Sequence, residues 1–456
     1  MGNPGHVRNF ESVLEALARR GHRLTVLFEE RKPGADESGL RFLDQLNQRR
    51  GTVRWEFQAG PQLGLRGSLR TILEAALDYL RYFELPYVGT DRLRARSVAF
   101  LPGRIECAMA AVLRSVPRGR RLLAAVASHA ARGLGETPEV RRELEARRPD
   151  VMMATPLVQF RSRQRAWVRT ARELGIPTVG CIYSWDILTN RGLMHAVPDR
   201  LVVWNDAQRA FAAELHGIPE ESIVVAGAWP YDHWLDWGPS RSREEFLEGL
   251  GLEADRATIL YACSSPFIAE REREAVEEWL RALRSAANDR VATANVIVRP
   301  HPLSSDQWLD GGPTDPRIAV FPPNAVDPVD EPTRGDYFDS IAHADAVVGV
   351  NTSALIESAI LDRPALAFPA PRFRSTQEEL PHFRLLVSQP GAVKTSGSVD
   401  EHLSELSVAL DNPMRDADGR RSFVETFIRP HGSDPPPTGR FVAAVEELLD
   451  ASSTGL

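Results

Sequence analysis

The sequence contains almost no lysine and very little cysteine. Lys32 and Lys394 are its only lysines, so arginine carries nearly all of its basic charge. The three cysteines, Cys107, Cys181 and Cys263, show neither a CxxC pair nor the spacing of a metal site. We therefore expect free thiols in a reducing compartment. We interpret these side chains as small buried hydrophobic groups.

Long apolar runs are also absent. No segment resembles a signal peptide, and no stretch of about 18 apolar residues could cross a bilayer. This predicts a soluble, cytoplasmic protein. The sequence has no short-period repeat and no DNA- or RNA-binding module.

The composition is that of a globular protein, and its charge is unevenly distributed. The 456 residues are 43% hydrophobic and 26% charged, which is enough for two substantial domains. Residues 1–150 contain 26 Lys+Arg against 18 Asp+Glu, whereas residues 151–456 contain 29 against 44. The acidic remainder argues against nucleic acid as the main partner. The basic part could lie near anionic lipid, although solvated helix faces explain it as well.

The first half begins with a turn rather than a strand. Residues 2–10 form a turn that leads into an amphipathic helix, and a strand follows at 24–28. A doubly wound domain normally has a strand before such a glycine turn. We therefore expect a truncated or misassigned start, or an edge strand supplied from elsewhere. A second strand is expected at 53–57.

Residues 61–148 are predicted to be a helical insertion, with breaks at Pro86, Pro102 and Pro117. Four aromatic residues lie on and after the first helix of this insertion. They either contact an acceptor substrate or pack in the core, and we favour core packing. The group consists of Tyr79, Tyr82, Phe83 and Tyr87.

Regular alternation of strands and helices resumes after the insertion. Strands are expected at 151–155, 177–182, 199–204 and 222–227. Asp186 follows the second of them, at the carboxyl edge where ligands bind in such sheets. A segment rich in Trp, Gly and Pro then marks a domain boundary near residue 236.

The second half restarts the pattern and contains the most informative stretch. Its strands are expected at 258–263, 295–298, 318–321, 346–350 and 365–368. The fourth strand stops at Asn351-Thr352-Ser353, where a helix should start, capped by Thr352 or Ser353. Such a turn presents backbone N–H groups to an anion. An ordinary capped helix gives the same pattern.

The sequence resembles the GT-B glycosyltransferases in three places. These are PGHVRNF with LARRGHRLTVL near the start, VRPHP, and ADAVVGVNTSALIESAILDRPALAF. The second half is most similar in style to the branch that contains CDP-glycerol glycerophosphotransferases and UDP-N-acetylglucosamine 2-epimerases. The resemblance implies an α/β fold with two Rossmann-like domains facing each other across a cleft. Residues 1–236 would bind the acceptor and residues 237–456 the nucleotide donor.

The resemblance also implies a donor site. Its diphosphate would lie against Asn351, Thr352 and Ser353, and its ribose near Glu357. The alternative for Glu357 is a solvent-facing helix residue. Arg299 and His301 would neutralise the diphosphate as the glycosyl bond breaks, unless their proline-flanked turn is only structural. The loop that contacts the base would include Ser264 and Ser265.

His6 occupies the position where many inverting GT-B enzymes keep their catalytic base. Imidazole suits this role because its ordinary pKa lies near neutral pH. Asp186 is the carboxylate that we expect to orient it, although His6 could also be a helix-start residue without a chemical role. No metal site and no cofactor are expected, because the DxD-like string at Asp416 and Asp418 lies in a late charged loop.

The sequence therefore predicts a glycosyltransferase, inverting and independent of metal, with a nucleotide sugar as co-substrate. The acceptor could be a glycan, a lipid-linked molecule or a small molecule, and the protein could contact the inner face of the membrane peripherally. Three alternatives remain: a CDP-linked polyol-phosphate transferase, a nucleotide-sugar 2-epimerase, and a non-catalytic nucleotide-sugar-binding protein. The epimerase is disfavoured because Asn351-Thr352-Ser353 replaces the glycine-rich SGG-type turn of those enzymes.

Overall fold

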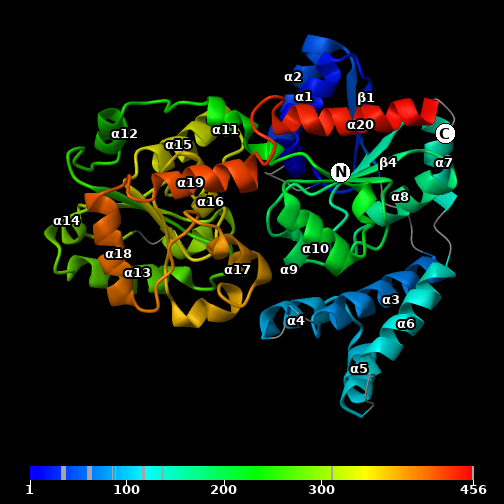
Figure 1. Cartoon of the computed structure of the whole chain (residues 1–456), viewed down its shortest axis with the longest axis horizontal. Coiled ribbons are helices and arrows are strands. Elements are labelled where there is room, and N and C mark those ends of the chain that lie inside the picture. Colours follow the sequence, from blue (N-terminus) through cyan, green and yellow to red (C-terminus); the bar gives the residue numbers. More distant parts are fainter. Residues whose placement is uncertain are drawn as a thin grey trace. The chain divides into compact units, whose positions relative to one another are not determined.

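The computed structural model describes residues 1–31, 37–58, 64–84, 86–87, 89–115, 119–134, 138–309 and 312–453. The chain forms two compact units. Unit 1 comprises Met1–Asp232 and Phe427–Leu456, and unit 2 comprises His233–Thr426 (Figure 1). The sequence assigned residues 237–456 to the second domain, whereas the residues from Phe427 onwards belong to unit 1.

Unit 1 contains two parallel sheets. Strand β1 (Leu24–Phe28) pairs with β2 (Val53–Phe57). The second sheet has the order β3-β4-β5-β6, with β3 (Met152–Ala154), β4 (Thr178–Cys181), β5 (Arg200–Val203) and β6 (Ile223–Val225). Every strand predicted in this half is present. The described residues contain no strand that pairs with both β1 and β3 and so connects the two sheets. The Met1 amino group donates a hydrogen bond of 2.7 Å to the Leu27 carbonyl of β1.

Apolar strands and amphipathic helices form the core of the four-stranded sheet. Helices α8 (Gln164–Glu173) and α10 (Asp206–His216) contribute to one buried cluster with these strands, including Val168, Leu201 and Ala212. Helix α10 starts where the Asn205 side chain accepts a hydrogen bond from the Gln208 N–H. It ends at Gly217, whose φ of 66° favours glycine.

The C-terminal helix α20 (Pro437–Ser453) belongs to unit 1 because its apolar side packs against the start of the chain. It contacts α1 (Glu11–Arg19), which follows the 3₁₀ turn η1 (Pro4–Asn9). The Phe441 ring lies 4.8 Å from Trp229 and 6.5 Å from Phe10 between centroids. These buried aromatic rings explain why the C-terminal segment is not part of unit 2.

The predicted insertion is helical. It consists of α3 (Leu65–Arg81), α4 (Asp91–Val98), α5 (Gly103–Ser115), α6 (Gly119–Arg132) and α7 (Pro138–Arg147), and α2 (Glu37–Arg50) precedes it. Helices α3 and α6 lie side by side (Figure 1). Tyr79, Tyr82 and Tyr87 are buried, and the Tyr82 and Tyr87 rings are 5.0 Å apart. The core interpretation of the aromatic group is therefore confirmed.

Helix α3 has a second buried face, which the sequence did not predict, and this face is charged. Glu74 lies 3.8 Å from Arg70 and 3.4 Å from Arg169, and it also pairs with Arg165. One turn further along, the Asp78 carboxylate accepts hydrogen bonds from the Leu193 N–H at 2.6 Å and from His195 at 2.9 Å. These polar contacts attach the insertion to α8 and to the segment after β4.

Unit 2 contains one parallel five-stranded sheet in the order β11-β10-β7-β8-β9. Its strands are β7 (Thr258–Ala262), β8 (Asn295–Arg299), β9 (Ile318–Val320), β10 (Ala346–Gly349) and β11 (Ala365–Ala367). All five were predicted. Every residue of β7, β8, β10 and β11 is buried, as expected of parallel strands covered on both faces.

Helices surround this sheet (Figure 1). The helices of unit 2 are α12 (Arg243–Gly249), α13 (Glu272–Arg284), α14 (Asp289–Ala292), α15 (Glu331–Ala342), α16 (Ala354–Ile360), α17 (Pro381–Ser388), α18 (Val399–Asp411) and α19 (Ala417–Phe423), with the 3₁₀ segments η4 (Pro302–Trp308) and η5 (Pro371–Thr376). Unit 1 also has the short segments α9 (Ile187–Asn190), η2 (Glu220–Ser222) and η3 (Trp229–Tyr231), and α11 (Asp232–Asp236) and η6 (Val424–Ile428) lie at the junctions of the two units.

Two of the three cysteines are buried and one is not. Cys181 and Cys263 are buried, and burial raises the pKa of the Cys263 thiol. Cys107 is exposed on α5, so the buried interpretation is wrong for this residue. None of the helices described here is both long and apolar enough to span a membrane.

Candidate functional site

The carboxyl edge of the unit 2 sheet brings together most of the predicted donor residues. Strand β7 lies between β10 and β8, and Tyr261 is in register with Val348 on one side and Val298 on the other. Because parallel strands end at the same edge, the turns that follow these strands are neighbours. The strand ends and turns at this edge contain Ser264, Ser265, Arg299, His301, Asn351, Thr352 and Ser353.

A chain of hydrogen bonds connects two of these turns. The Asn351 N–H donates to Ser264 Oγ at 3.2 Å. The Ser264 N–H in turn donates to Glu272 Oε2 at 2.6 Å. Ser264 and Glu272 are both almost completely buried, so Ser264 supports the turn from within, whereas Ser265 is partly exposed.

The Asn351 side chain is buried and only partly satisfied. Its Nδ2 donates to the Thr376 carbonyl at 2.9 Å and lies 3.3 Å from His382 Nε2. Its Oδ1 is buried without a hydrogen-bond partner among the described residues. A buried acceptor without a donor is costly, so this oxygen suits a ligand that brings a hydroxyl or N–H group.

Thr352 and Ser353 form the partly exposed start of α16. Ser353 occupies the N-cap position but makes no side-chain cap hydrogen bond, whereas Thr352 Oγ1 lies 3.5 Å from the Ala354 N–H. The sequence predicted a cap by Thr352 or Ser353, and of these two side chains only Thr352 makes a contact, which is long. A Cβ at Gly349 would lie 2.9 Å from the Ala262 carbonyl, so this close approach of β10 to β7 requires glycine.

Arg299 and Glu357 are connected through Tyr337. The Tyr337 hydroxyl donates to Glu357 Oε2, and the Arg299 guanidinium carbon lies 4.7 Å from the centroid of the Tyr337 ring. Burial lowers the pKa of Arg299, and the negative charges nearby, Glu357 included, oppose this effect. Glu357 is 8% exposed, so it is not a solvent-facing helix residue.

The His301 side chain accepts a hydrogen bond from the backbone of the segment that follows it. Its Nδ1 accepts a hydrogen bond of 3.1 Å from the Leu303 N–H, which caps η4. This contact requires an unprotonated Nδ1 and orients the ring at the end of β8.

Glu272 is the site residue that the sequence did not reveal. Burial raises the pKa of its carboxyl to about 8, and the hydrogen bonds from Ser264 and Tyr261 oppose this rise. In the sequence this residue stands in the charged run Arg271-Glu272-Arg273-Glu274, which is typical of a solvated helix start. Its position eight residues after Ser264, in the first turn of a helix that follows a strand end, is the only signal available.

In unit 1, His6 lies in the turn η1. The Asn3 N–H donates to His6 Nδ1 at 3.4 Å, and the His6 ring packs edge-on against Tyr183 with centroids 5.5 Å apart. A Cβ at Gly2 would lie 3.3 Å from the imidazole. These contacts hold the ring next to the end of β4.

Asp186 also lies next to the end of β4. Its carboxylate accepts hydrogen bonds of 2.5 Å from Ser184 and from Asn190. Burial raises the pKa of Tyr183, Arg191 opposes the rise, and the charge of Asp186 adds to it. Tyr183 is therefore a neighbour of both His6 and Asp186, and it is a further polar group of this site.

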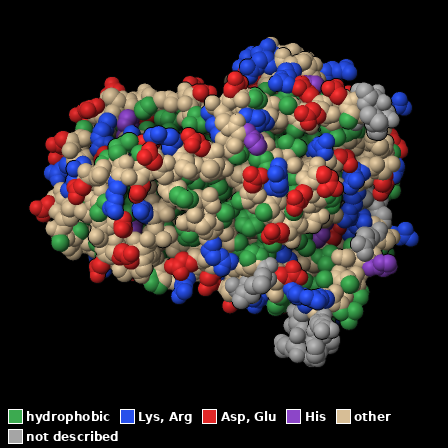
Figure 2. Space-filling view, in the orientation of Figure 1, with side chains coloured by type: hydrophobic (Ala, Val, Ile, Leu, Met, Phe, Trp, Pro, Cys, Tyr) green, Lys and Arg blue, Asp and Glu red, His purple; other side chains and the backbone are tan. Residues whose placement is uncertain are grey.

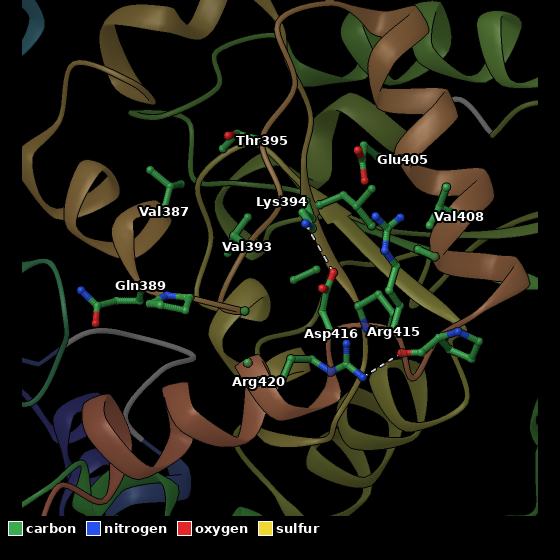
Figure 3. Close-up of a pocket in the computed structure, with 18 of the residues that line it drawn as sticks. Val387, Gln389, Val393, Lys394, Thr395, Glu405, Val408, Arg415, Asp416 and Arg420 are labelled. Carbon is green, nitrogen blue, oxygen red and sulfur yellow. Dashed lines mark hydrogen bonds and ion pairs between the residues drawn. The ribbon is translucent and has the colours of Figure 1, made fainter.

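A cavity of about 440 Å³ in unit 2 lies apart from these residues (Figure 3). It is lined by residues of β11, α17, α18 and α19 and of their connections, and by none of the predicted donor residues. Lys394 and Asp416 form an ion pair of 3.4 Å in its wall. The described residues contain no group of three or more His, Cys, Asp or Glu that could hold a metal ion.

Comparisons with known proteins identify the fold. No protein-family model and no curated protein matches the chain. Among solved structures, MnaA of S. aureus in complex with UDP aligns over 98% of this chain and 95% of that chain, with a TM-score of 0.52 and 11% identity. A UDP-N-acetylglucosamine 2-epimerase aligns over 99% of this chain and 95% of that chain, with a TM-score of 0.51 and 13% identity.

The wall teichoic acid polymerase TagF also matches, over 56% of this chain and 58% of that chain, at a TM-score of 0.37 and 15% identity, which is too low to carry an argument. The alignments to MnaA and the epimerase cover nearly the whole of each chain, but their low identity supports the fold alone. The α/β architecture predicted from the sequence is therefore confirmed, and the chain has the GT-B fold.

Proposed function

We propose that the protein is a nucleotide-sugar enzyme that binds its nucleotide diphosphate at the carboxyl edge of the unit 2 sheet. The backbone N–H groups of Thr352 and Ser353 donate to no other described residue, which leaves them for phosphate oxygens. The Asn351 Oδ1 accepts a hydroxyl or N–H of the ligand. Arg299 and His301 supply positive charge or hydrogen-bond donors, and Glu357 accepts from the ribose.

The first candidate activity is epimerisation at C2 of a UDP-N-acetylhexosamine. The observation that carries it is the alignment of nearly the whole chain with a UDP-N-acetylglucosamine 2-epimerase and with a UDP complex. A base removes the proton from C2 while the C1–C2 double bond forms and UDP leaves from C1. UDP then adds back at C1 while an acid returns a proton to the opposite face of C2. His6 is our candidate for one of these groups, and Asp186 and Tyr183 are its polar neighbours.

The second candidate is glycosyl transfer to an acceptor hydroxyl. The observation that favours it is the turn Asn351-Thr352-Ser353, which replaces the glycine-rich turn typical of the epimerases. In this reaction His6 removes the acceptor proton, the acceptor oxygen forms a bond to the anomeric carbon, and the nucleoside diphosphate leaves.

One NMR experiment separates these activities. UDP-N-acetylglucosamine is incubated with the protein in D₂O, first alone and then with an acceptor panel. Epimerisation requires no acceptor and gives the C2 epimer, which carries deuterium at C2. Transfer gives UDP and a new glycoside only with an acceptor. If either product forms and His6→Ala forms it at the rate of the parent, the catalytic assignment of His6 is wrong.

A binding panel tests the nucleotide preference and the remaining alternatives. UDP-, GDP-, TDP- and CDP-linked ligands are compared by thermal shift, and we expect UDP-linked ligands to stabilise the protein most. Selectivity for cytidine would favour transfer of a polyol phosphate. Binding without turnover would favour a non-catalytic nucleotide-sugar-binding protein, and no binding at all would contradict the donor site.

A further inference from the structure

Two helices of the insertion carry large apolar side chains on their surface. On α6, Leu122 and Val126 are each 59% exposed. At the start of α3, Leu65 is 93% and Leu69 is 49% exposed. Single exposed leucines are ordinary, but pairs spaced four residues apart on adjacent helices form a surface feature.

The exposed residues of α6 form one face. Leu122, Ala125, Val126 and His129 are all exposed and follow the helical spacing i, i+3, i+4 and i+7. The opposite face, with Ala127 and Ala131, is buried. Helix α6 is therefore apolar on both faces, although only one of them has a partner within the described part of unit 1. We call the exposed residues Leu122, Ala125, Val126 and His129 the outer face of α6.

The charged face of α3 explains why apolar residues point outwards. Glu74 and Asp78 are buried against α8 and the segment after β4, so this face must point towards the body of unit 1. Leu65 and Leu69 lie on the opposite side of α3, at the helical phase of Ala76 and Leu80, which pack in the core of the insertion. The apolar stripe of α3 is therefore directed away from the body and remains uncovered at its first two turns.

The same helices carry positive charge that is not neutralised. Residues 61–132 contain 12 arginines and 5 acidic residues, and α6 has no acidic residue. Arg66, Arg104 and Arg121 are exposed, and none of them forms an ion pair with another described residue. In Figure 2, hydrophobic and basic side chains are interspersed over this part of unit 1, at the lower right.

We propose that the outer face of α6, together with Leu65 and Leu69 of α3, docks on an anionic lipid bilayer. Apolar side chains enter the boundary between headgroups and acyl chains, and the unpaired guanidinium groups bind lipid phosphates. Charge complementarity favours this partner over a second copy of the chain, because symmetric pairing would bring two copies of the same positively charged surface together.

Vesicle flotation with the full chain tests the proposal. We expect the protein to float with vesicles that contain phosphatidylglycerol, to float weakly with phosphatidylcholine alone, and to dissociate as salt is added. The double variant Leu122→Glu with Val126→Glu should reduce binding at least tenfold. A matched control, Leu309→Glu with Met414→Glu, makes the same change at exposed positions of unit 2 and should bind as the parent does.

The variant Arg66→Gln with Arg104→Gln and Arg121→Gln leaves the apolar residues intact and should lose the preference for anionic lipid. Circular dichroism and light scattering check the fold and the oligomeric state of each variant. The proposal is overturned if the parent does not bind anionic vesicles, or if the apolar and arginine variants bind like the parent. The proposal is also overturned if the parent is an oligomer and the apolar variant does no more than dissociate it. The outer face of α6 would then bind a second copy of the chain.

Discussion

Asn351 gives the most direct test of the donor site at the scale of single residues. Replacing it by alanine removes the unpaired Oδ1 acceptor. We expect Asn351→Ala to weaken UDP binding by about 1 to 2 kcal/mol, roughly tenfold, because one hydrogen bond to the ligand is lost. Isothermal titration calorimetry measures this change.

The exposed Asn412→Ala, in the same unit, is the matched control and should bind UDP normally. The melting temperatures of both variants must be compared, because Asn351 also donates to the Thr376 carbonyl. A folded Asn351→Ala protein with unchanged affinity would contradict the site.

Glu272 predicts a dependence of stability on pH. Burial raises the pKa of its carboxyl in the folded state to about 8, so the folded protein holds a proton that the unfolded chain releases near pH 4.5. Stability from this group is therefore fully present below pH 4.5 and is lost as the pH rises through about 8. Glu272→Gln cannot ionise, so its free energy of unfolding should fall less between pH 5 and 8 than that of the parent.

Denaturant unfolding at several pH values measures the effect, with the exposed Glu244→Gln as control. We expect the difference between Glu272→Gln and the parent to grow by several kcal/mol over this range. Parallel stability curves for the two proteins would contradict the burial of a protonated carboxyl.

Single residues also show where the sequence was informative. The order of residues around Asn351 predicted a turn at a strand end, because β10 is apolar and ends abruptly in polar residues. Glu272 and Glu357 could not be distinguished from solvated glutamates, because their burial depends on Tyr261 and Tyr337, which are distant in sequence. Side-chain environments of this kind arise only after the strands have assembled.

At the scale of elements, the charged face of α3 forms a buried ion-pair network. We expect this network to make a large contribution to the free energy of unfolding of the insertion. Glu74→Ala would leave Arg165 buried and unpaired. We expect a loss of about 3 kcal/mol in the free energy of unfolding. Chemical denaturation followed by circular dichroism measures this loss.

Glu84→Ala is the matched control, because Glu84 pairs with Arg120 at 2.7 Å near the surface. This exposed pair should contribute less than about 1 kcal/mol. Equal losses for the two variants would show that the charged face does not hold α3 in place.

The elements themselves were largely predictable, and the attachment of α3 was not. Apolar periodicity identified every strand and the helical character of residues 65–147, because burial of apolar side chains determines both. Periodicity did not show which side of α3 faces the body of unit 1. In the structure the charged side faces the body, because the buried arginines of α8 supply partners for Glu74.

At the scale of the whole molecule, unit 2 is a single continuous segment, whereas unit 1 is built from two segments. A protein consisting of residues 233–426 retains the complete five-stranded sheet and all predicted donor residues. We expect it to fold alone and to bind UDP with an affinity within about threefold of that of the full chain, since all residues of the proposed donor site lie within it. Calorimetry on the isolated unit tests this.

The corresponding control removes residues from Phe427 onwards in the full chain. This deletion takes away α20 and exposes Phe10 and Trp229, so unit 1 should be destabilised while UDP binding by unit 2 persists. If the isolated unit 2 fails to fold, the division of the chain into units is wrong.

The two crossings between the units are fixed at one point of unit 1. The Asp232 carboxylate lies 3.3 Å from the Arg429 guanidinium and accepts a hydrogen bond of 2.7 Å from the Thr438 N–H, so the outgoing and returning chains meet there. In this topology unit 2 is a domain inserted between two segments of unit 1. Exchange of residues 233–426 for the corresponding segment of another protein with the GT-B fold would therefore move the whole proposed donor site in one step, and the Asp232 carboxylate would still join the two connections.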